Sequence, residues 1–218
     1  STAMCEMSSE TDDPLLSAAL RGDQRALADL MDRHRPRLER IVQLRMDPCL
    51  QGRIDPADVV QETCVAALDR FDAYRHGNRE FPFFLWLRLE TLQKLVDLHR
   101  FHLGAKMRSA YGEVSLHGGA PPVSSASLAG QLIGKLSTAS GAVMRAELSL
   151  LVEDALNKMS AEDREILCLR HFEELSNIEA ASVLGLSATA ASNRHVRALR
   201  RLRSVFQSIP GGLDQLTL

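Results

Sequence analysis

Residues 176–206, SNIEAASVLGLSATAASNRHVRALRRLRSVF, determine how the C-terminal part of the chain folds. They have the pattern of a short helix, a glycine-centred turn and a longer helix that carries five arginines. Ser176 and Glu179 form an S-x-x-E capping box, which satisfies free backbone N–H groups at the start of a helix. Gly185 suits the sharp turn because a residue without a Cβ adopts a left-handed conformation at little cost. The stretch therefore predicts a helix-turn-helix motif.

Ser187 is placed to cap the longer helix, and the residues that follow divide between two faces. An apolar stripe at helical spacing is expected to be buried; it comprises Ala191, His195, Ala198, Leu199, Leu202, Val205 and Phe206. The opposite face carries Thr189, Asn193, Arg197 and Arg200. Such a polar row can meet base edges near its N-terminus and DNA phosphates further along. The alternative is a solvated helix end whose arginines complement the helix dipole.

The composition is that of an ordinary globular protein, with 218 residues, of which 45% are hydrophobic and 25% charged. The formal net charge of -2 is unevenly distributed. Residues 187–206 contain arginines and no acid, whereas the first thirteen residues are acidic. A protein that binds DNA alone is usually more basic overall. We therefore expect another molecule to supply much of the affinity for DNA.

The four cysteines, Cys5, Cys49, Cys64 and Cys168, are too scattered for a zinc ribbon or a CxxC redox site. No signal peptide and no apolar run of membrane-spanning length is recognised, so we expect a protein of the reducing cytoplasm that does not associate with membranes. The three residues ahead of Met4 suggest a cloning remnant, so the native chain is expected to begin at Met4.

Aspartates mark the starts of helices in the N-terminal half. Asp13 and Asp55 each precede a proline, which is favourable in the first helical turn, and Asp23 can open a helix after Gly22. Three helices are predicted here. The first begins at residue 14, the second runs over about 24–46, and the third runs from 56 to about 71. His34 lies on an apolar face, where a core or boundary histidine is favoured over a metal ligand.

The helix that begins at residue 56 carries a polar patch on its outer side. The patch consists of Asp55, Asp58, Gln61 and Glu62. Acids at this end of a helix favour its dipole, which is one interpretation. A solvent-facing helix surface offers no pocket that would shift a carboxyl pKa for acid–base catalysis. A docking surface for a basic or amphipathic partner is the better functional interpretation.

A polar loop over residues 72–80 is followed by an amphipathic helix over about 81–103. Aromatic residues gather at the start of this helix, and we expect most of them in the core rather than stacked on unpaired bases. The loop and helix also carry a set of polar and basic residues: Asn78, Arg79, Arg88, Lys94, His99 and Arg100. His99 and His102 are one helical turn apart, but no third ligand is near, so no metal site is predicted.

Glycine, serine, proline and alanine dominate from residue 104, which predicts a long linker over 104–142. Leu128, Leu132, Ile133 and Leu136 could form a short helix within it. An N-terminal domain over 13–103 and a C-terminal domain over 143–207 would flank the linker. Because nothing along the chain alternates like a strand, the predicted fold class is all-α, with two small helical domains.

Together the two halves resemble a bacterial extracytoplasmic-function (ECF) RNA polymerase sigma factor. The first shared motif is D-x-x-D-[LV]-[VA]-Q-E, present here as DPADVVQE over residues 55–62. The helix with the F-x-x-[FW]-L core corresponds to FFLWLRLETLQKLVDLHR. The C-terminal motif corresponds to GLSATAASNRHVRALRRL, in which Ala190, Ser192 and Leu199 replace the threonine, lysine and arginine common in the family. The small-residue linker is similar to those of planctomycete-like members.

The resemblance implies a role for each surface. In the family the acidic helix binds core RNA polymerase, which assigns that role to Asp55, Asp58, Gln61 and Glu62. The 72–103 segment corresponds to the part that recognises and opens the minus-ten promoter element, which implies roles for Asn78, Arg79, Arg88, Lys94, His99 and Arg100. The helix-turn-helix corresponds to the minus-thirty-five reader, which implies roles for Ser187, Thr189, Asn193, Arg194, Arg197, Arg200 and Arg201. No cofactor is implied.

Family members are commonly held inactive, which implies an anti-sigma factor or a regulatory kinase as a further partner. We hypothesise that the linker lets the two domains close on each other and mask both DNA-binding surfaces. One rival is a stand-alone helix-turn-helix regulator with an N-terminal sensing or dimerisation domain. The other is a nucleic-acid enzyme such as a recombinase, but Tyr74 and Tyr111 are the only tyrosines and the acids lie on exposed helix positions. No catalytic residue is therefore predicted.

Overall fold

The computed structural model describes residues 13–77, 81–103, 120–135 and 142–207. These residues form helices and no β-strand, which confirms the predicted all-α fold class. The expected start at Met4 and the predicted loop residues Asn78 and Arg79 lie outside the described residues. No helix in the described part is both long enough and apolar enough to span a membrane.

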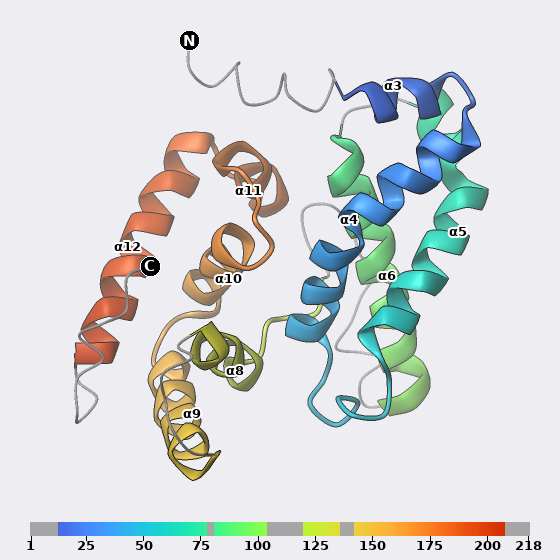
Figure 1. Cartoon of the computed structure of the whole chain (residues 1–218). Coiled ribbons are helices and arrows are strands. Elements are labelled where there is room, and N and C mark those ends of the chain that lie inside the picture. Colours follow the sequence, from blue (N-terminus) through green and yellow to red (C-terminus); the bar gives the residue numbers. More distant parts are fainter. Residues whose placement is uncertain (1–12, 78–80, 104–119, 136–141, 208–218) are drawn as a thin grey trace.

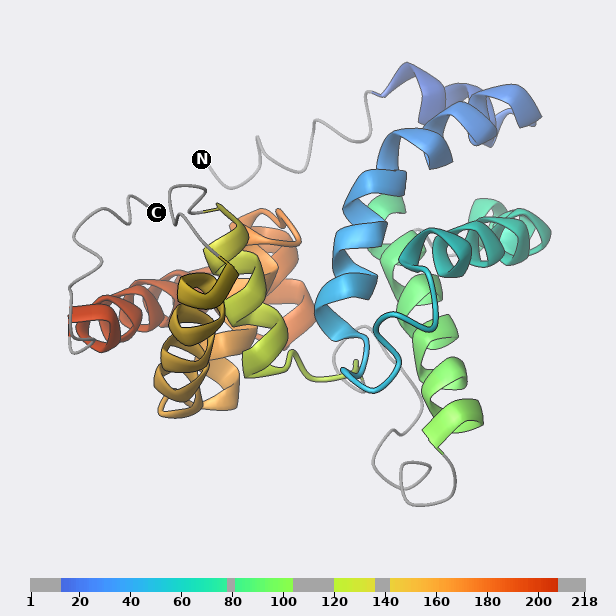
Figure 2. The same ribbon diagram turned by 60° about the horizontal axis from the view of Figure 1, so that its bottom comes forward.

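The described part of the N-terminal half consists of α3 (Pro14–Leu20), α4 (Gln24–Arg45), α5 (Pro56–His76) and α6 (Phe83–Leu103) (Figure 1). The carboxylates of Asp13, Asp23 and Asp55 accept hydrogen bonds from backbone N–H groups at the starts of α3, α4 and α5. The three predicted caps are thus confirmed. Pro36 inside α4 removes one helical hydrogen bond, and α4 bends along its length (Figure 2).

Aromatic side chains build the core of this half. Phe83 and Phe84 are buried, and Trp86 stacks on Tyr74 with ring centroids 4.8 Å apart. The expectation that most of these aromatics are core residues is confirmed. Helix α5, however, continues to His76 instead of ending near Phe71. Phe71 and Tyr74 are one turn apart and both pack on the same aromatic cluster, so the intervening polar residues remain helical.

Five helices follow: α8 (Ser125–Lys135), α9 (Ala142–Asn157), α10 (Ala161–His171), α11 (Asn177–Leu184) and α12 (Ala188–Gln207). Helix α8 is the short helix expected within the predicted linker. Its Leu128, Leu132 and Ile133 are buried, and α8 packs on α9 and on α4. The buried hydrophobic residues of the two halves therefore form one continuous cluster, with α8 between them (Figures 1 and 2).

The helix-turn-helix has the predicted local geometry. The Ser176 hydroxyl accepts a hydrogen bond from the Glu179 N–H at 3.2 Å, and the Glu179 carboxylate accepts one from the Ser176 N–H at 2.6 Å. Gly185 has a φ of 62°, in the left-handed region. The Ser187 hydroxyl accepts a hydrogen bond from the Ala190 N–H at 3.2 Å and so caps α12. The sequence signals for this motif are therefore confirmed.

Candidate nucleic-acid and protein interfaces

Helix α12 separates a packed face from a solvent face. Ala191, Ala198, Leu202 and Phe206 are buried against the rest of the C-terminal half. Ser187 and the predicted polar row, Thr189, Asn193, Arg197 and Arg200, are exposed. In both views α12 lies on the side of the C-terminal half that faces away from the N-terminal helices (Figures 1 and 2). The row is therefore free to approach a DNA groove in this arrangement.

Two side chains of the predicted DNA-binding set are less free than the polar row. Arg201 forms an ion pair with Asp163 of α10 through an otherwise exposed guanidinium. Arg194 is half-buried. His195, on the inner side of α12, lies 2.8 Å from His171 of α10, measured between the two Nε2 atoms. Burial, followed by the neighbouring His171, lowers the pKa of His195, and the contact between the two rings links α12 to α10.

The predicted protein-binding patch on α5 is exposed and borders a groove. Asp55, Asp58, Gln61 and Glu62 all face solvent. The groove is lined by Asp58, Gln61, Glu62, Val65, Ala66, Asp69 and Lys94. The ammonium of Lys94 lies 2.5 Å from a Glu62 carboxylate oxygen. Acidic groups around exposed Val65 give this face both charge and apolar area for a partner.

Of the residues predicted to contact the minus-ten element, the four in the described part of the chain do not form one surface. Lys94 lies at the α5 groove, and Arg100 pairs with Asp97 one turn earlier in α6. His99 is buried and accepts a hydrogen bond from the Asp47 N–H at 3.1 Å, and burial lowers its pKa. Arg88 is buried as well. The assignment of His99 and Arg88 to a DNA-facing surface does not fit this arrangement, because neither side chain reaches solvent.

Arg88 instead belongs to an ion-pair network between the two halves. Its Nε donates to one carboxylate oxygen of Glu173 at 2.6 Å. The other oxygen of Glu173 accepts from Nε of Arg45 at 2.7 Å, and Nη2 of Arg45 lies 2.5 Å from a carboxylate oxygen of Glu165. Arg45 also donates to the Pro121 carbonyl at 2.8 Å. Residues from α4, α6, α10 and the α10–α11 turn thus meet at a single point.

The network is charged despite its burial. Burial alone would raise the pKa of Glu173, but the guanidinium groups of Arg45 and Arg88 outweigh that effect and hold the pKa at about 2. Burial alone would lower the pKa of Arg45, and Glu165 and Glu173 raise it instead. In the Arg45–Glu173–Arg88 triad, Arg45 and Glu173 are therefore both ionised at neutral pH.

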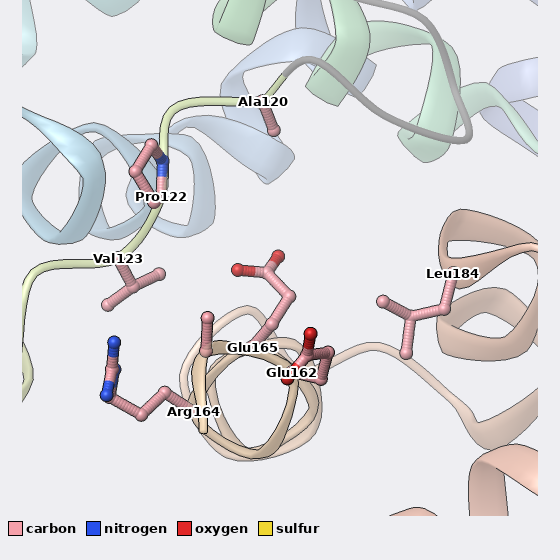
Figure 3. Close-up of a pocket in the computed structure, with 8 residues that line it drawn as sticks. Ala120, Pro122, Val123, Glu162, Arg164, Glu165 and Leu184 are labelled. Carbon is pink, nitrogen blue, oxygen red and sulfur yellow. The ribbon is translucent and has the colours of Figure 1, made fainter. Parts of the chain in front are cut away.

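A pocket adjoins this network where α10 faces the segment before α8. Its lining includes Ala120, Pro122, Val123, Glu162, Glu165 and Leu184. Figure 3 shows the Glu165 carboxylate pointing from α10 toward Ala120 and Pro122. Glu165 is therefore available both to Arg45 and to the pocket, and the segment at 120–123 is part of the contact between the halves.

Arg45, Glu165 and Glu173 were not predicted as a site from the sequence. One signal was available: Arg45 falls seven residues after Leu38, on the apolar face of α4, where a charge requires a partner. The identity of that partner was not accessible, because Glu173 is 128 residues away in the sequence.

Comparison with known proteins agrees with the architecture. The family model for sigma-70, region 4, matches residues 149–202. The RNA polymerase sigma factor NccH of Alcaligenes xylosoxydans xylosoxydans is 32% identical over 90% of this chain and 95% of its own length. CnrH of Cupriavidus metallidurans is 33% identical over 93% of this chain and 98% of its own. The ECF RNA polymerase sigma factor SigD of Mycobacterium tuberculosis is 28% identical over 90% of this chain and 84% of its own.

The chain belongs to the ECF RNA polymerase sigma factors. A structure of CnrH in complex with the cytosolic domain of CnrY is similar to it, with a TM-score of 0.50, 28% identity and coverage of 88% of this chain and 94% of that one. As a sigma factor, the protein is a transcription initiation factor that binds core RNA polymerase and promoter DNA. This family membership favours that role over the stand-alone helix-turn-helix regulator.

Proposed function

We propose that this ECF sigma factor divides its work between two exposed surfaces. The α5 patch of Asp55, Asp58, Gln61 and Glu62 binds core RNA polymerase. The α12 face, with Ser187, Thr189, Asn193, Arg194, Arg197, Arg200 and Arg201, binds the minus-thirty-five element. The observation that carries the proposal is that the patch and the polar row are both exposed. The packed contact between the two halves, which we call the closed contact, buries other residues, among them Arg45, Arg88 and Glu173. The protein acts by binding, without a catalytic step, in the cytoplasm.

The minus-ten element falls to the α6 region in this proposal. Asn78 and Arg79 precede α6, and Lys94 and Arg100 are partly accessible on it. Arg88 and His99 would require a rearrangement of the closed contact before they could approach DNA. The core polymerase supplies the orientation and much of the affinity, which fits the small net charge of the chain.

A protein that holds the free factor inactive completes the proposal. CnrH, which is similar over most of both chains, has been solved with the cytosolic domain of CnrY. We propose an anti-sigma factor as the corresponding partner of this chain. Binding of the anti-sigma factor should abolish run-off transcription, and adding more core polymerase should not restore it.

Run-off transcription with core polymerase tests the division of labour. The protein should direct initiation from a subset of a promoter library. Asp58→Asn with Glu62→Gln should abolish co-purification with core polymerase, because it removes two carboxylates from the patch. Asp154→Asn, at an exposed position of α9, is the control and should leave core binding unchanged. Core binding that survives the patch substitutions would refute the assignment of this surface.

A further inference from the structure

Four guanidinium groups converge on the α10–α11 turn from the N-terminal half. They belong to Arg37, Arg40 and Arg45 of α4 and to Arg88 of α6, and we call them the arginine cluster. We propose that the arginine cluster is a binding site for the phosphates of promoter DNA, which the carboxylates of Glu165, Glu173 and Glu174 occupy in the closed protein. The inference rests on the proposed function, since it adds a DNA contact to the same factor.

The geometry at Glu173 is that of a bound oxyanion. Each of its two carboxylate oxygens accepts from a different arginine, Arg45 at 2.7 Å and Arg88 at 2.6 Å. The Glu173, Arg45 and Arg88 side chains are at most 3% exposed. Arginine forks recognise carboxylate and phosphate oxygens in the same way. A phosphate could therefore take the place of the Glu173 carboxylate without any change in the donors.

Arg37 and Arg40 hold the same turn from its outer side. Arg37 lies over the Phe84 ring, with its guanidinium carbon 3.4 Å from the ring centroid. From there it donates to the backbone carbonyls of Glu173 at 2.6 Å and Glu174 at 2.8 Å. Arg40 pairs with the Glu174 carboxylate at 2.7 Å. Glu174 has a φ of 55°, which costs about 1 kcal/mol or more for a residue other than glycine, so the arginine contacts offset strain in the turn.

The arginine cluster has more donors than the turn satisfies. Arg40 Nε and Arg88 Nη2 are buried and have no hydrogen-bond partner among the described residues. A buried donor without an acceptor is costly, and a phosphate offers more acceptor oxygens than a carboxylate. The cluster therefore fits an anion with more acceptor oxygens than the carboxylates it holds.

DNA is the anion favoured by the remaining surface. The closed contact leaves the α12 row exposed, so promoter DNA can engage the C-terminal half first and raise the local concentration of phosphates. If Arg45 and Arg88 exchange the carboxylate for a phosphate, both guanidinium charges stay paired. Opening the contact without a new anion would instead leave them unpaired. In the free factor, the carboxylates would suppress binding to DNA that lacks a promoter.

The test compares DNA affinity as a function of salt, without core polymerase. The opened variant carries Glu165→Gln, Glu173→Gln and Glu174→Gln in the full chain. Fluorescence anisotropy with a labelled duplex should show at least tenfold tighter binding than wild type at 50 mM KCl. The slope of log K against log salt should steepen, by about 0.9 for each phosphate newly contacted.

Adding Arg37→Gln and Arg40→Gln to the opened variant should reduce that slope by about 1.8 and remove most of the gain. Arg25→Gln with Arg53→Gln is the matched control, because both arginines are exposed elsewhere on the N-terminal half. A gain that survives loss of Arg37 and Arg40, or that the control pair removes equally, would overturn the proposal. No gain in a folded opened variant would overturn it too.

If circular dichroism shows that the triple substitution unfolds the chain, Glu174→Gln alone replaces it. Its side chain is 59% exposed, and the change should steepen the slope by about 0.9, an effect that Arg40→Gln should cancel. An unchanged slope in this variant would overturn the proposal. Because the assay contains no polymerase, its failure is distinct from a failure of run-off transcription.

Discussion

His34 shows how a single side chain can be forced to remain neutral. Its ring lies against Phe84, with centroids 5.2 Å apart, and near Phe83 at 6.0 Å. Burial, with help from the charges of Arg37 and Arg33, lowers its pKa from 6.5 to about 4. The structure confirms that His34 is a boundary histidine of the core, and no cluster of three metal-ligating side chains occurs among the described residues.

The first prediction concerns pH. Between pH 6.5 and 4 the unfolded chain binds a proton at His34 and the folded chain does not, so the free energy of unfolding should fall as pH falls through this window. His99 and His195, whose pKa values burial also lowers, act in the same direction. Urea unfolding at pH 7, 6 and 5 measures the slope. His34→Gln should flatten it, and an unaltered slope would contradict the assignment.

The second prediction concerns Arg197, in the middle of the exposed row of α12. Arg197→Ala should weaken binding to cognate promoters by about 1–3 kcal/mol if the side chain reads a base, and transcription should fall accordingly. Stability should change by less than about 0.5 kcal/mol, because the side chain is exposed. Core polymerase binding should survive.

Lys158→Ala supplies the control for charge. Lys158 is exposed directly after α9 and pairs with Asp154 of that helix, so the substitution removes one positive charge without changing α12. Promoter titrations and core co-purification should match wild type. Loss of core binding by Arg197→Ala would contradict the separation of the two surfaces.

At the scale of elements, the turn between α11 and α12 depends on backbone conformation rather than on space. A Cβ added to Gly185 would meet no atom within 4 Å, yet its φ of 62° is unfavourable for any other residue type. Gly185→Ala should therefore destabilise the fold by about 1–2 kcal/mol through strain alone. Thermal unfolding measures the loss.

Gly130→Ala, in α8, is the matched control for that third prediction. A Cβ there also meets nothing within 4 Å, but the backbone is helical. Alanine should therefore stabilise the chain by about 0.5–1 kcal/mol. Equal effects of the two substitutions would refute the conformational argument.

Local signals explain why the elements were largely predictable. Caps at Asp13, Asp23, Asp55 and Ser176 fix helix starts through contacts within three residues, so the sequence contains all the information needed. The end of α5 was not predictable in this way. Polar residues 72–76 read as a loop, but Tyr74 stacks on Trp86 of α6 and keeps the last turns helical. Tertiary packing overrode the local pattern.

The candidate site residues also fall into two groups, those that local sequence patterns predict and those whose surroundings depend on distant residues. The α5 patch and the α12 row are exposed faces of single helices, which periodicity alone places correctly. Arg88 was assigned to DNA because it is basic and lies on α6, yet its environment is set by Glu173, 85 residues away. A charged side chain without an obvious partner reads as solvated, and sequence periodicity does not reveal the distant carboxylate that buries it.

For the whole molecule, the closed contact differs from the hypothesis that both DNA-binding surfaces are masked. The halves do contact each other, and this contact covers Arg45 of α4 and Arg88 of α6. The α12 row remains exposed. The composition of residues 104–142 predicted a free linker, but α8 is held by its buried leucines, so the connection is partly a packed element.

The fourth prediction is the salt dependence of this closed state. Surface ion pairs such as Arg40 with Glu174 weaken above about 0.1 M salt, but salt screens the buried Arg45–Glu173–Arg88 triad only weakly. The contact of α8 with its neighbours is apolar and does not depend on ion pairs. Small-angle scattering of the free protein should therefore give a similar, compact radius of gyration at 50 mM and 500 mM NaCl. A compact chain of this length has a radius of gyration of about 17 Å.

Leu128→Asp with Leu132→Asp tests which contact dominates. Both side chains are at most 3% exposed and lie between α8 and the C-terminal helices. Two buried carboxylates at these positions would prevent α8 from packing there. If the apolar packing of α8 holds the halves together, the radius of gyration of this variant should increase at both salt concentrations. If the Arg45–Glu173–Arg88 triad alone holds them together, the radius of gyration should increase only when Glu173→Gln is added. An extended wild-type protein at both concentrations would instead show that the closed contact does not form in solution, and the arginines of α4 would then be open to DNA without a competitor.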